Sequence, residues 1–204
     1  MTANDLCAYA GLTAVFLATA NICLGLLIAV RYSPWRSWPH RRINYFRVHN
    51  WTGYLLLLVT FLHPVFLLFV KTARFRPVDI IYPVHSPVQP VENTVGAAAL
   101  YLLAIVVVSS YFRLGLGRKL WKRTHFLVYA AAACAFVHGI LADPELKGSA
   151  VDPLDGEKLF VEACFLAVAV GSWLALRYRA RRSDQKRARR APAIASEGAL
   201  FSED

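Results

Sequence analysis

The sequence predicts an all-α protein, a polytopic membrane bundle of five transmembrane helices, and three observations carry this prediction. First, 57% of the 204 residues are hydrophobic and only 18% are charged, whereas soluble domains carry about 25% charged residues. Second, five long apolar runs each approach the ~20 residues that a helix needs to cross a bilayer. Third, the basic residues flank these runs, so the net charge of +10 indicates membrane-flanking loops and no nucleic-acid binding.

Each predicted span follows from its own stretch of sequence. The first lacks the basic segment that opens a secretory signal and stays apolar well beyond ~15 residues, which predicts a retained helix. The second contains Pro64, which removes a backbone hydrogen bond and can bend a helix. The last leads into an arginine-rich segment. In order, the spans are 8–30, 43–70, 94–112, 120–141 and 159–176. We expect residues 1–182 to form the bundle and residues 183–204 a disordered cytoplasmic tail.

Loop charge predicts the orientation, because short cytoplasmic loops hold an excess of Lys and Arg. The first-to-second connection, the third-to-fourth connection and the C-terminal tail together hold 18 of the 23 basic residues. The fourth-to-fifth connection instead carries five acids, Asp143, Glu145, Asp152, Asp155 and Glu157, against Lys147. The N-terminus is therefore predicted outside and the C-terminus inside.

Four histidines lie within the spans at matched depths. His49 and His63 stand at positions i and i+14 of the second run, and His125 and His138 stand at i and i+13 of the fourth. With a rise of about 1.5 Å per residue these spacings correspond to about 21 and about 20 Å along two parallel helices. Because imidazole is an axial ligand of haem iron, two helices bearing two histidines each predict two stacked haem sites. The i, i+13 spacing leaves an angular offset of about 140° between His125 and His138, which helix crossing or local distortion must absorb.

The cysteines indicate how a haem would be attached, and the charged residues near the inner histidines indicate what could surround the inner haem. Covalent attachment needs Cys-x-x-Cys-His, and Cys134 with His138 has the wrong spacing, so two noncovalent b haems are expected. Basic residues near the inner histidines could neutralise haem propionates or could serve only as positive-inside charges. They are Arg47, Arg118, Lys122 and Arg123. Gly53 and Gly139 are open to two interpretations, close porphyrin approach or ordinary helix packing.

The pattern His49-x13-His63-Pro64, with Arg113 and Trp121-x3-His125-x3-Tyr129-x8-His138, resembles the ferric reductase-like transmembrane domain over about residues 43 to 178. The resemblance implies two b haems, with His49 paired to His125 and His63 to His138, that carry electrons from the cytoplasm to the outer face. It also implies a compact bacterial form in the inner membrane. We expect five spans rather than the six of the full-length enzymes, and the sequence predicts no flavin- and nicotinamide-binding domain. The donor is therefore expected to be a separate cytoplasmic reductase, a flavin or the quinone pool, and an outer-face acceptor is expected as well.

Two other functions remain open from the sequence. One is a quinol-coupled b-type cytochrome subunit, and the other is a haem-free transporter lined by histidines. His85, in the outer loop, is interpreted as an ordinary loop histidine more readily than as a metal ligand, because one imidazole alone is a poor metal site.

Overall fold

The computed structural model describes residues 2–31, 44–71, 73–143, 146, 152 and 154–200, with only the backbone from 186 onward. Its regular elements are all helical. They are α1 (Ala3–Val30), α2 (Tyr45–Val65), the 3₁₀ turn η2 (Phe66–Phe69), α3 (Pro77–Ile81), the 3₁₀ turn η3 (Pro83–His85), α4 (Pro90–Tyr111), α5 (Arg113–His125), α6 (Leu127–Leu141) and α7 (Gly156–Leu200). Five helical stretches are long and apolar enough to cross a membrane, one of them α5 and α6 together. The all-helical fold and the five spans are thereby confirmed.

Local sequence explains where the first helices begin. Thr2 and Asp5 form a capping box at the start of α1, in which each side chain accepts a hydrogen bond from the other's backbone N–H. Asn44 caps α2 by accepting from the backbone N–H of Arg47. α4 begins with Pro90 at its first position, where a missing N–H costs nothing.

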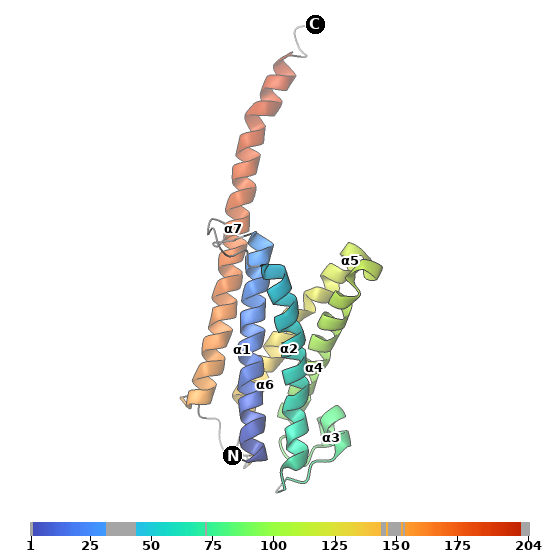
Figure 1. Ribbon diagram of the computed structural model, residues 1–204. Coiled ribbons are helices and arrows are strands. Elements are labelled where there is room, and N and C mark those ends of the chain that lie inside the picture. Colours follow the sequence, from blue (N-terminus) through green and yellow to red (C-terminus); the bar gives the residue numbers. More distant parts are fainter. Residues whose placement is uncertain are drawn as a thin grey trace.

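α1 is central to the bundle and packs against α2, α6 and α7, while α4 packs mainly against α6 (Figure 1). One apolar cluster joins α1, α6 and α7 around Val161, which is 1% exposed. A second joins α2, α4 and α6 through Leu56, Leu103 and Ala131. Two helix pairs, α1 with α2 and α4 with α6, therefore face each other across the middle of the bundle.

The fourth predicted span is interrupted, and the interruption bears on the angular offset between His125 and His138. α5 ends at His125 and α6 begins at Leu127, with Phe126 between them. The N–H of Tyr129 donates to the carbonyl of Phe126, three positions back, at 3.2 Å. This tightened turn adds rotation per residue relative to an α-helix. It moves His125 and His138 toward one face, which is the local distortion that the spacing requires.

A second break lies within α5, at Gly117. Its backbone has φ 73° and ψ 154°, outside the helical region. Glycine adopts such a φ at no steric cost, whereas a side chain would be strained. The break separates the corner after α4 from the segment that carries Trp121 and His125.

α7 continues well beyond the bundle (Figure 1). Its backbone is helical from Gly156 to Leu200 without a break at residue 182. The predicted division into a bundle of residues 1–182 and a disordered tail stays a prediction.

The described helices are divided between the two ends of the bundle. α5 and the C-terminal part of α7 lie toward one end, and the N-terminus and α3 lie at the other (Figure 1). Which end faces the cytoplasm stays a prediction. We expect a reporter fused after Asp204 to be cytoplasmic and a tag inserted within 143–155 to be labelled from outside by an impermeant reagent. Opposite labelling would reverse the assignment.

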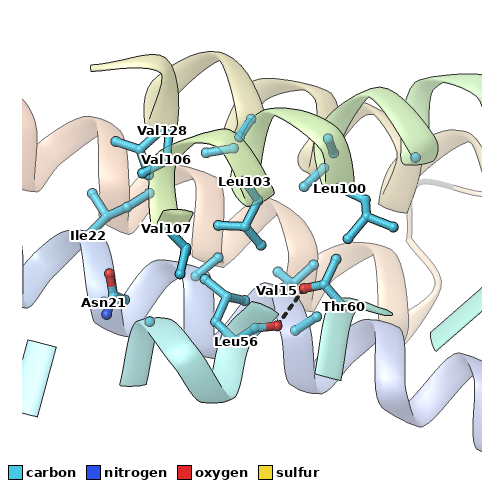
Figure 2. A pocket seen from close by; sticks show the side chains of 18 of the residues that line it. Val15, Asn21, Ile22, Leu56, Thr60, Leu100, Leu103, Val106, Val107 and Val128 are labelled. Carbon is cyan, nitrogen blue, oxygen red and sulfur yellow. Dashed lines mark hydrogen bonds between the residues drawn. The ribbon is translucent and has the colours of Figure 1, made fainter. Parts of the chain in front are cut away.

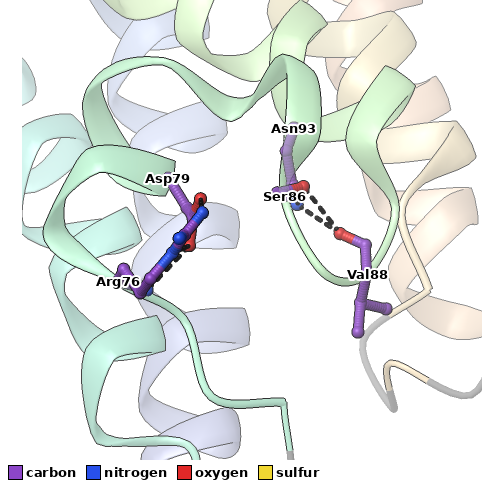
Figure 3. Close-up of polar contacts among 5 residues, drawn as sticks. All are labelled: Arg76, Asp79, Ser86, Val88 and Asn93. Carbon is purple, nitrogen blue, oxygen red and sulfur yellow. Dashed lines mark hydrogen bonds and ion pairs between the residues drawn. The ribbon is translucent and has the colours of Figure 1, made fainter.

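The segment after α2 closes the predicted outer end. Phe75 and Val70 are buried there with Cys7 of α1. Asp79 is 4% exposed and accepts hydrogen bonds from the backbone and guanidinium of Arg76, while Asn93 donates to Ser86 and to the carbonyl of Val88 (Figure 3). Polar contacts within the segment therefore fix its path over the bundle.

The Arg76–Asp79 contact makes this segment sensitive to acid. Hydrogen bonding from the Arg76 side chain holds the pKa of the Asp79 carboxyl below its ordinary value. A carboxyl of this kind contributes stability above its unfolded-state pKa of about 4 and loses it as the pH falls through the folded-state value. We expect amide exchange in α3, corrected for intrinsic rate, to quicken below pH 4. Asp79→Asn should exchange quickly at neutral pH too, and an unchanged Asp79→Asn profile would contradict the assignment.

Candidate functional site

The structure brings the four membrane-embedded histidines together as two pairs. His49 of α2 faces His125 at the end of α5, with ring centres 6.1 Å apart and planes at 66°. His63 of α2 faces His138 of α6, with ring centres 6.0 Å apart and planes at 76°. We call these the inner pair and the outer pair, after the predicted orientation. α2 and α5–α6 therefore run parallel with matched depths.

Three of the four imidazoles are oriented by backbone carbonyls. The Nδ1 atom of His49 lies 3.1 Å from the carbonyl oxygen of Asn21, and that of His63 lies 2.8 Å from the carbonyl oxygen of Cys7. His138 Nδ1 lies 2.8 Å from the carbonyl oxygen of Glu92. A carbonyl only accepts, so Nδ1 carries the proton and Nε2 keeps its lone pair in each ring. This is the tautomer of an imidazole that binds a metal through Nε2.

His125 has a different partner. Its Nδ1 lies 3.1 Å from the hydroxyl oxygen of Ser110, which also accepts a hydrogen bond from Trp121 Nε1 at 3.4 Å. The indole ring of Trp121 lies beside the imidazole, 5.3 Å between ring centres. A hydroxyl can accept from the Nδ1–H of His125 as the carbonyls do for the other three rings.

Glycines on the neighbouring helices make room for these rings. A methyl group at Gly11 would lie 3.0 Å from His63 Cε1, and one at Gly25 would lie 3.3 Å from His49 Cε1. At Gly96 it would lie 3.0 Å from both Cε1 and Nδ1 of His138. Each of these three rings thus packs so closely on helix backbone that a side chain at the glycine would force the ring to shift.

The same glycines expose the carbonyls that orient the rings. Each acceptor carbonyl belongs to the residue four positions earlier: Cys7 before Gly11, Asn21 before Gly25 and Glu92 before Gly96. In a helix the carbonyl of residue i already accepts from the N–H of residue i+4, and the Cβ of residue i+4 leans back over it. Without that Cβ, the second lone pair of the carbonyl is open to the imidazole.

Sequence reasoning did not identify α1 and α4 as contributors, although a signal exists. Gly25 follows Gly11 at position i+14, which is the spacing of His49 and His63, the two histidines that they face. Ser110 follows Gly96 at i+14 as well, within one position of the spacing of His125 and His138. The helices that flank the histidines therefore repeat the histidine spacing.

Asn21 was also missed. Its side chain donates to the carbonyl of His49 at 2.6 Å and to the hydroxyl of Thr52 at 2.7 Å. Because its own carbonyl contacts the His49 ring, Asn21 holds both the ring and the backbone of His49. A lone asparagine in an apolar run is the signal that could have pointed to it, since a polar side chain within a membrane needs a partner.

One continuous cavity of about 900 Å³ reaches all four histidines. Between the two pairs its wall is aliphatic, formed by residues including Val15, Leu56, Leu103 and Val106 (Figure 2). Asn21 and Thr60 add polar atoms to this section (Figure 2). Charged lining residues lie toward the two ends instead, among them Arg113, Arg118 and Lys122 at one end and Asp143, Glu157 and Lys158 at the other.

The four basic residues singled out from the sequence divide into two groups. Arg118 and Lys122 line the mouth of the cavity at the inner end, whereas Arg47 and Arg123 are exposed and are not among its lining residues. Arg113 lies at the same mouth and places its guanidinium 4.7 Å from the ring centre of Phe46.

The two glycines left open by the sequence face other residues. Gly139 lines the cavity, and a Cβ added there would lie 3.3 Å from both methyl groups of Val161 in α7. Gly53 faces the side-chain nitrogen of Asn21 at 3.6 Å. His85 is exposed in η3 and does not line the cavity. The sixth histidine of the sequence, His40, lies outside the described residues.

The sequence model of the ferric reductase like transmembrane component family matches residues 14–136. The chain belongs to this family. Membership implies electron transfer across a membrane, and members generally bind haem and need a redox partner. Together with the five apolar helices, it identifies an integral membrane protein. The match begins in α1 rather than near residue 43 and ends just before His138. No curated protein and no solved structure matches the chain.

Proposed function

We propose that this ferric reductase-like protein carries electrons through two stacked b-type haems, one held by His49 and His125 and the other by His63 and His138. The observation that supports this most is the ring separation within each pair. A metal bound to two imidazoles at about 2 Å from each nitrogen places their ring centres about 6 Å apart, and the two pairs stand at 6.1 and 6.0 Å.

The donor set fits haem better than a bare metal ion. Among the described residues, no group of three or more His, Cys, Asp or Glu side chains could hold a metal. Haem iron brings four nitrogen ligands of its own and needs only the two axial positions that a histidine pair offers. When bound, haem supplies one-electron redox chemistry at its iron. The free cysteines are scattered, so attachment is noncovalent.

The chain's own role is to position the imidazoles and keep ions out of the path. The carbonyls of Cys7, Asn21 and Glu92 fix the ring orientation and increase the basicity of each ligand. Among the described residues that line the middle section of the cavity, none carries a charged side chain that could relay a proton. This argues for an electron path and against the haem-free transporter, which would need titratable groups there.

Electrons would enter at the inner mouth, where Arg113, Arg118 and Lys122 attract an anionic donor. We propose a separate cytoplasmic reductase or a flavin as that donor, an acceptor at the outer face, and the bacterial inner membrane as the location. Arg47 and Arg123 would then act as positive-inside charges, while Arg118 and Lys122 could also meet haem propionates.

A second candidate, the quinol-coupled cytochrome, is favoured by one feature. An apolar groove of about 540 Å³ lies between α2, α3 and α4, lined by residues that include Phe61, Pro64 and Tyr101. Pro64 follows His63 directly, so a lipophilic electron carrier in the groove would lie close to the outer pair. Inhibition of haem reduction by quinone analogues would favour this function, and indifference to them would favour the reductase-driven one.

The haem content tests the proposal directly. We expect purified protein to carry about two b haems per chain by pyridine-haemochrome quantitation, because two complete ligand pairs are present. His85→Ala should leave this value unchanged. A content near one would contradict the two-haem proposal, and a protein without a Soret band would favour the transporter.

A further inference from the structure

A buried lysine lies beside the outer pair. Lys158, in the first turn of α7, is 5% exposed and lines the cavity together with His138 and Gly139. Its ammonium donates to the carbonyl of Gly139 at 3.1 Å and to the carbonyl of Ala142. It therefore caps the last turn of α6, the helix that carries His138.

The ammonium forms no ion pair within the described part of the chain. The ion pair found there is Arg76–Asp79, and the carboxylates of Asp143, Asp155 and Glu157 attract Lys158 only at longer range. A buried charge is costly unless an opposite charge accompanies it. The helix C-terminus supplies only about half a negative charge, and the described residues use two of the three N–H groups of the ammonium. Asp143 and Glu157 also line the cavity, and the third N–H leaves a position there for an anion.

We propose that Lys158 binds a carboxylate of the cofactor held by His63 and His138 and raises that cofactor's reduction potential above that of the cofactor at the inner pair. This inference rests on the proposed function. Haem b carries two propionates, which are the carboxylates that a noncovalent haem would bring to this position.

The effect on potential follows from charge. A buried positive charge stabilises the reduced form of a nearby redox group, because reduction adds an electron. At the inner mouth, Arg118 and Lys122 are exposed and therefore screened by water and salt. Arg113 is half-buried there, and its guanidinium lies over the ring of Phe46. Lys158 thus biases electrons toward the outer pair, and it is a positioning and tuning residue rather than a catalytic one.

Three variants of the full-length holoprotein separate charge from capping. Lys158→Gln keeps a donor for the α6 carbonyls and removes the charge, Lys158→Met removes both, and Lys158→Arg keeps both. Lys71→Gln is the matched control, because Lys71 is an exposed lysine at the same end of the bundle and does not line the cavity. Each is titrated potentiometrically by its haem absorption, first in buffer free of carboxylate chelators and then with citrate.

In chelator-free buffer we expect Lys158→Gln and Lys158→Met to lower the equilibrium constant for reducing one haem at least tenfold, about 59 mV for a one-electron couple. The other haem should keep its wild-type potential in these two variants. In Lys158→Arg and Lys71→Gln, both haems should keep their wild-type potentials. Unchanged potentials in Lys158→Gln, with both haems present, would overturn the inference and leave the proposed function intact. A shift seen only with citrate would overturn it too, because the carboxylate would then belong to an external ligand. If Lys158→Gln fails to retain haem, the other two variants test the inference. A wild-type haem potential in Lys158→Met, or a lowered one in Lys158→Arg, would then overturn the assignment of the effect to the charge of Lys158.

Discussion

His63→Ala should remove the outer haem and leave the inner haem in place and reducible. The truncated pair keeps one imidazole, and a site shaped for two axial ligands holds five-coordinate iron poorly. Because the loss of groups that merely orient a ligand already costs about 10- to 100-fold in affinity, we expect retention at the outer pair to fall by at least about 100-fold. A cytoplasmic donor would still reduce the inner haem, and transfer to an outer acceptor would stop.

His49→Ala should have the opposite consequence. Electron entry would be blocked because the inner haem is lost, so the remaining outer haem would stay oxidised although it is present. His125→Ala should behave like His49→Ala, and His138→Ala like His63→Ala. Both the inner-pair and the outer-pair variants would thus fail to transfer electrons across the membrane. They would differ in whether the donor can reduce the haem that remains.

The measurement uses inverted vesicles to which a flavin-reductase donor is added, with haem reduction followed by absorption for all four variants. His85→Ala is the matched control, since this histidine is exposed in η3 and does not line the cavity. Loss of the same haem in His49→Ala and His63→Ala would contradict the pairing, because both residues lie on α2 and belong to different pairs. Full reduction of the remaining haem in His49→Ala would contradict the predicted direction of entry.

Features that depend on nearby residues in the sequence could be predicted from it, whereas features that depend on tertiary contacts could not. The five spans could be predicted because hydrophobicity over ~20 residues is a local property. The matched depths of His49 with His125 and of His63 with His138 could also be predicted, because helix rise is constant along two parallel helices. The i, i+13 spacing of His125 and His138 also required helix crossing or a local distortion. The position of the distortion, at Phe126, could not be predicted, because the spacing does not specify that the N–H of Tyr129 donates to the carbonyl of Phe126.

The partners of the histidines could not be predicted from the same argument. They lie on α1 and α4, and which helices flank α2 and α6 is a matter of tertiary packing. Gly139 illustrates the limit, because its place next to His138 in the sequence does not reveal that it also packs against Val161 of α7. Gly11 and Gly96 instead belong to other helices than the histidines that they contact, far away along the chain.

The second large effect is expected from these distant glycines, because a single added methyl group should disable the outer pair. In Gly96→Ala the new Cβ lies 3.0 Å from two ring atoms of His138, and in Gly11→Ala it lies 3.0 Å from His63 Cε1, against an optimal carbon contact of about 3.5–4.0 Å. The rings cannot retreat freely, since each is held at 2.8 Å to a backbone carbonyl. Overpacking of a buried site costs about 1–3 kcal/mol, which is a roughly 5- to 150-fold loss in affinity for the outer haem.

The matched control is Gly171→Ala in α7, which does not line the cavity and in which the added methyl group meets Leu26 Cδ1 at an ordinary 3.4 Å. We expect the control to retain both haems, and Gly11→Ala and Gly96→Ala to retain the inner haem alone, as counted by pyridine haemochrome and by the number of steps in a redox titration. The selective loss matters more than its size, because general destabilisation of the bundle would deplete both haems in parallel. If Gly96→Ala bound two haems with wild-type potentials, His138 could not be fixed against the α4 backbone as the Glu92 carbonyl contact requires, and the account of how glycines orient the ligands would be wrong.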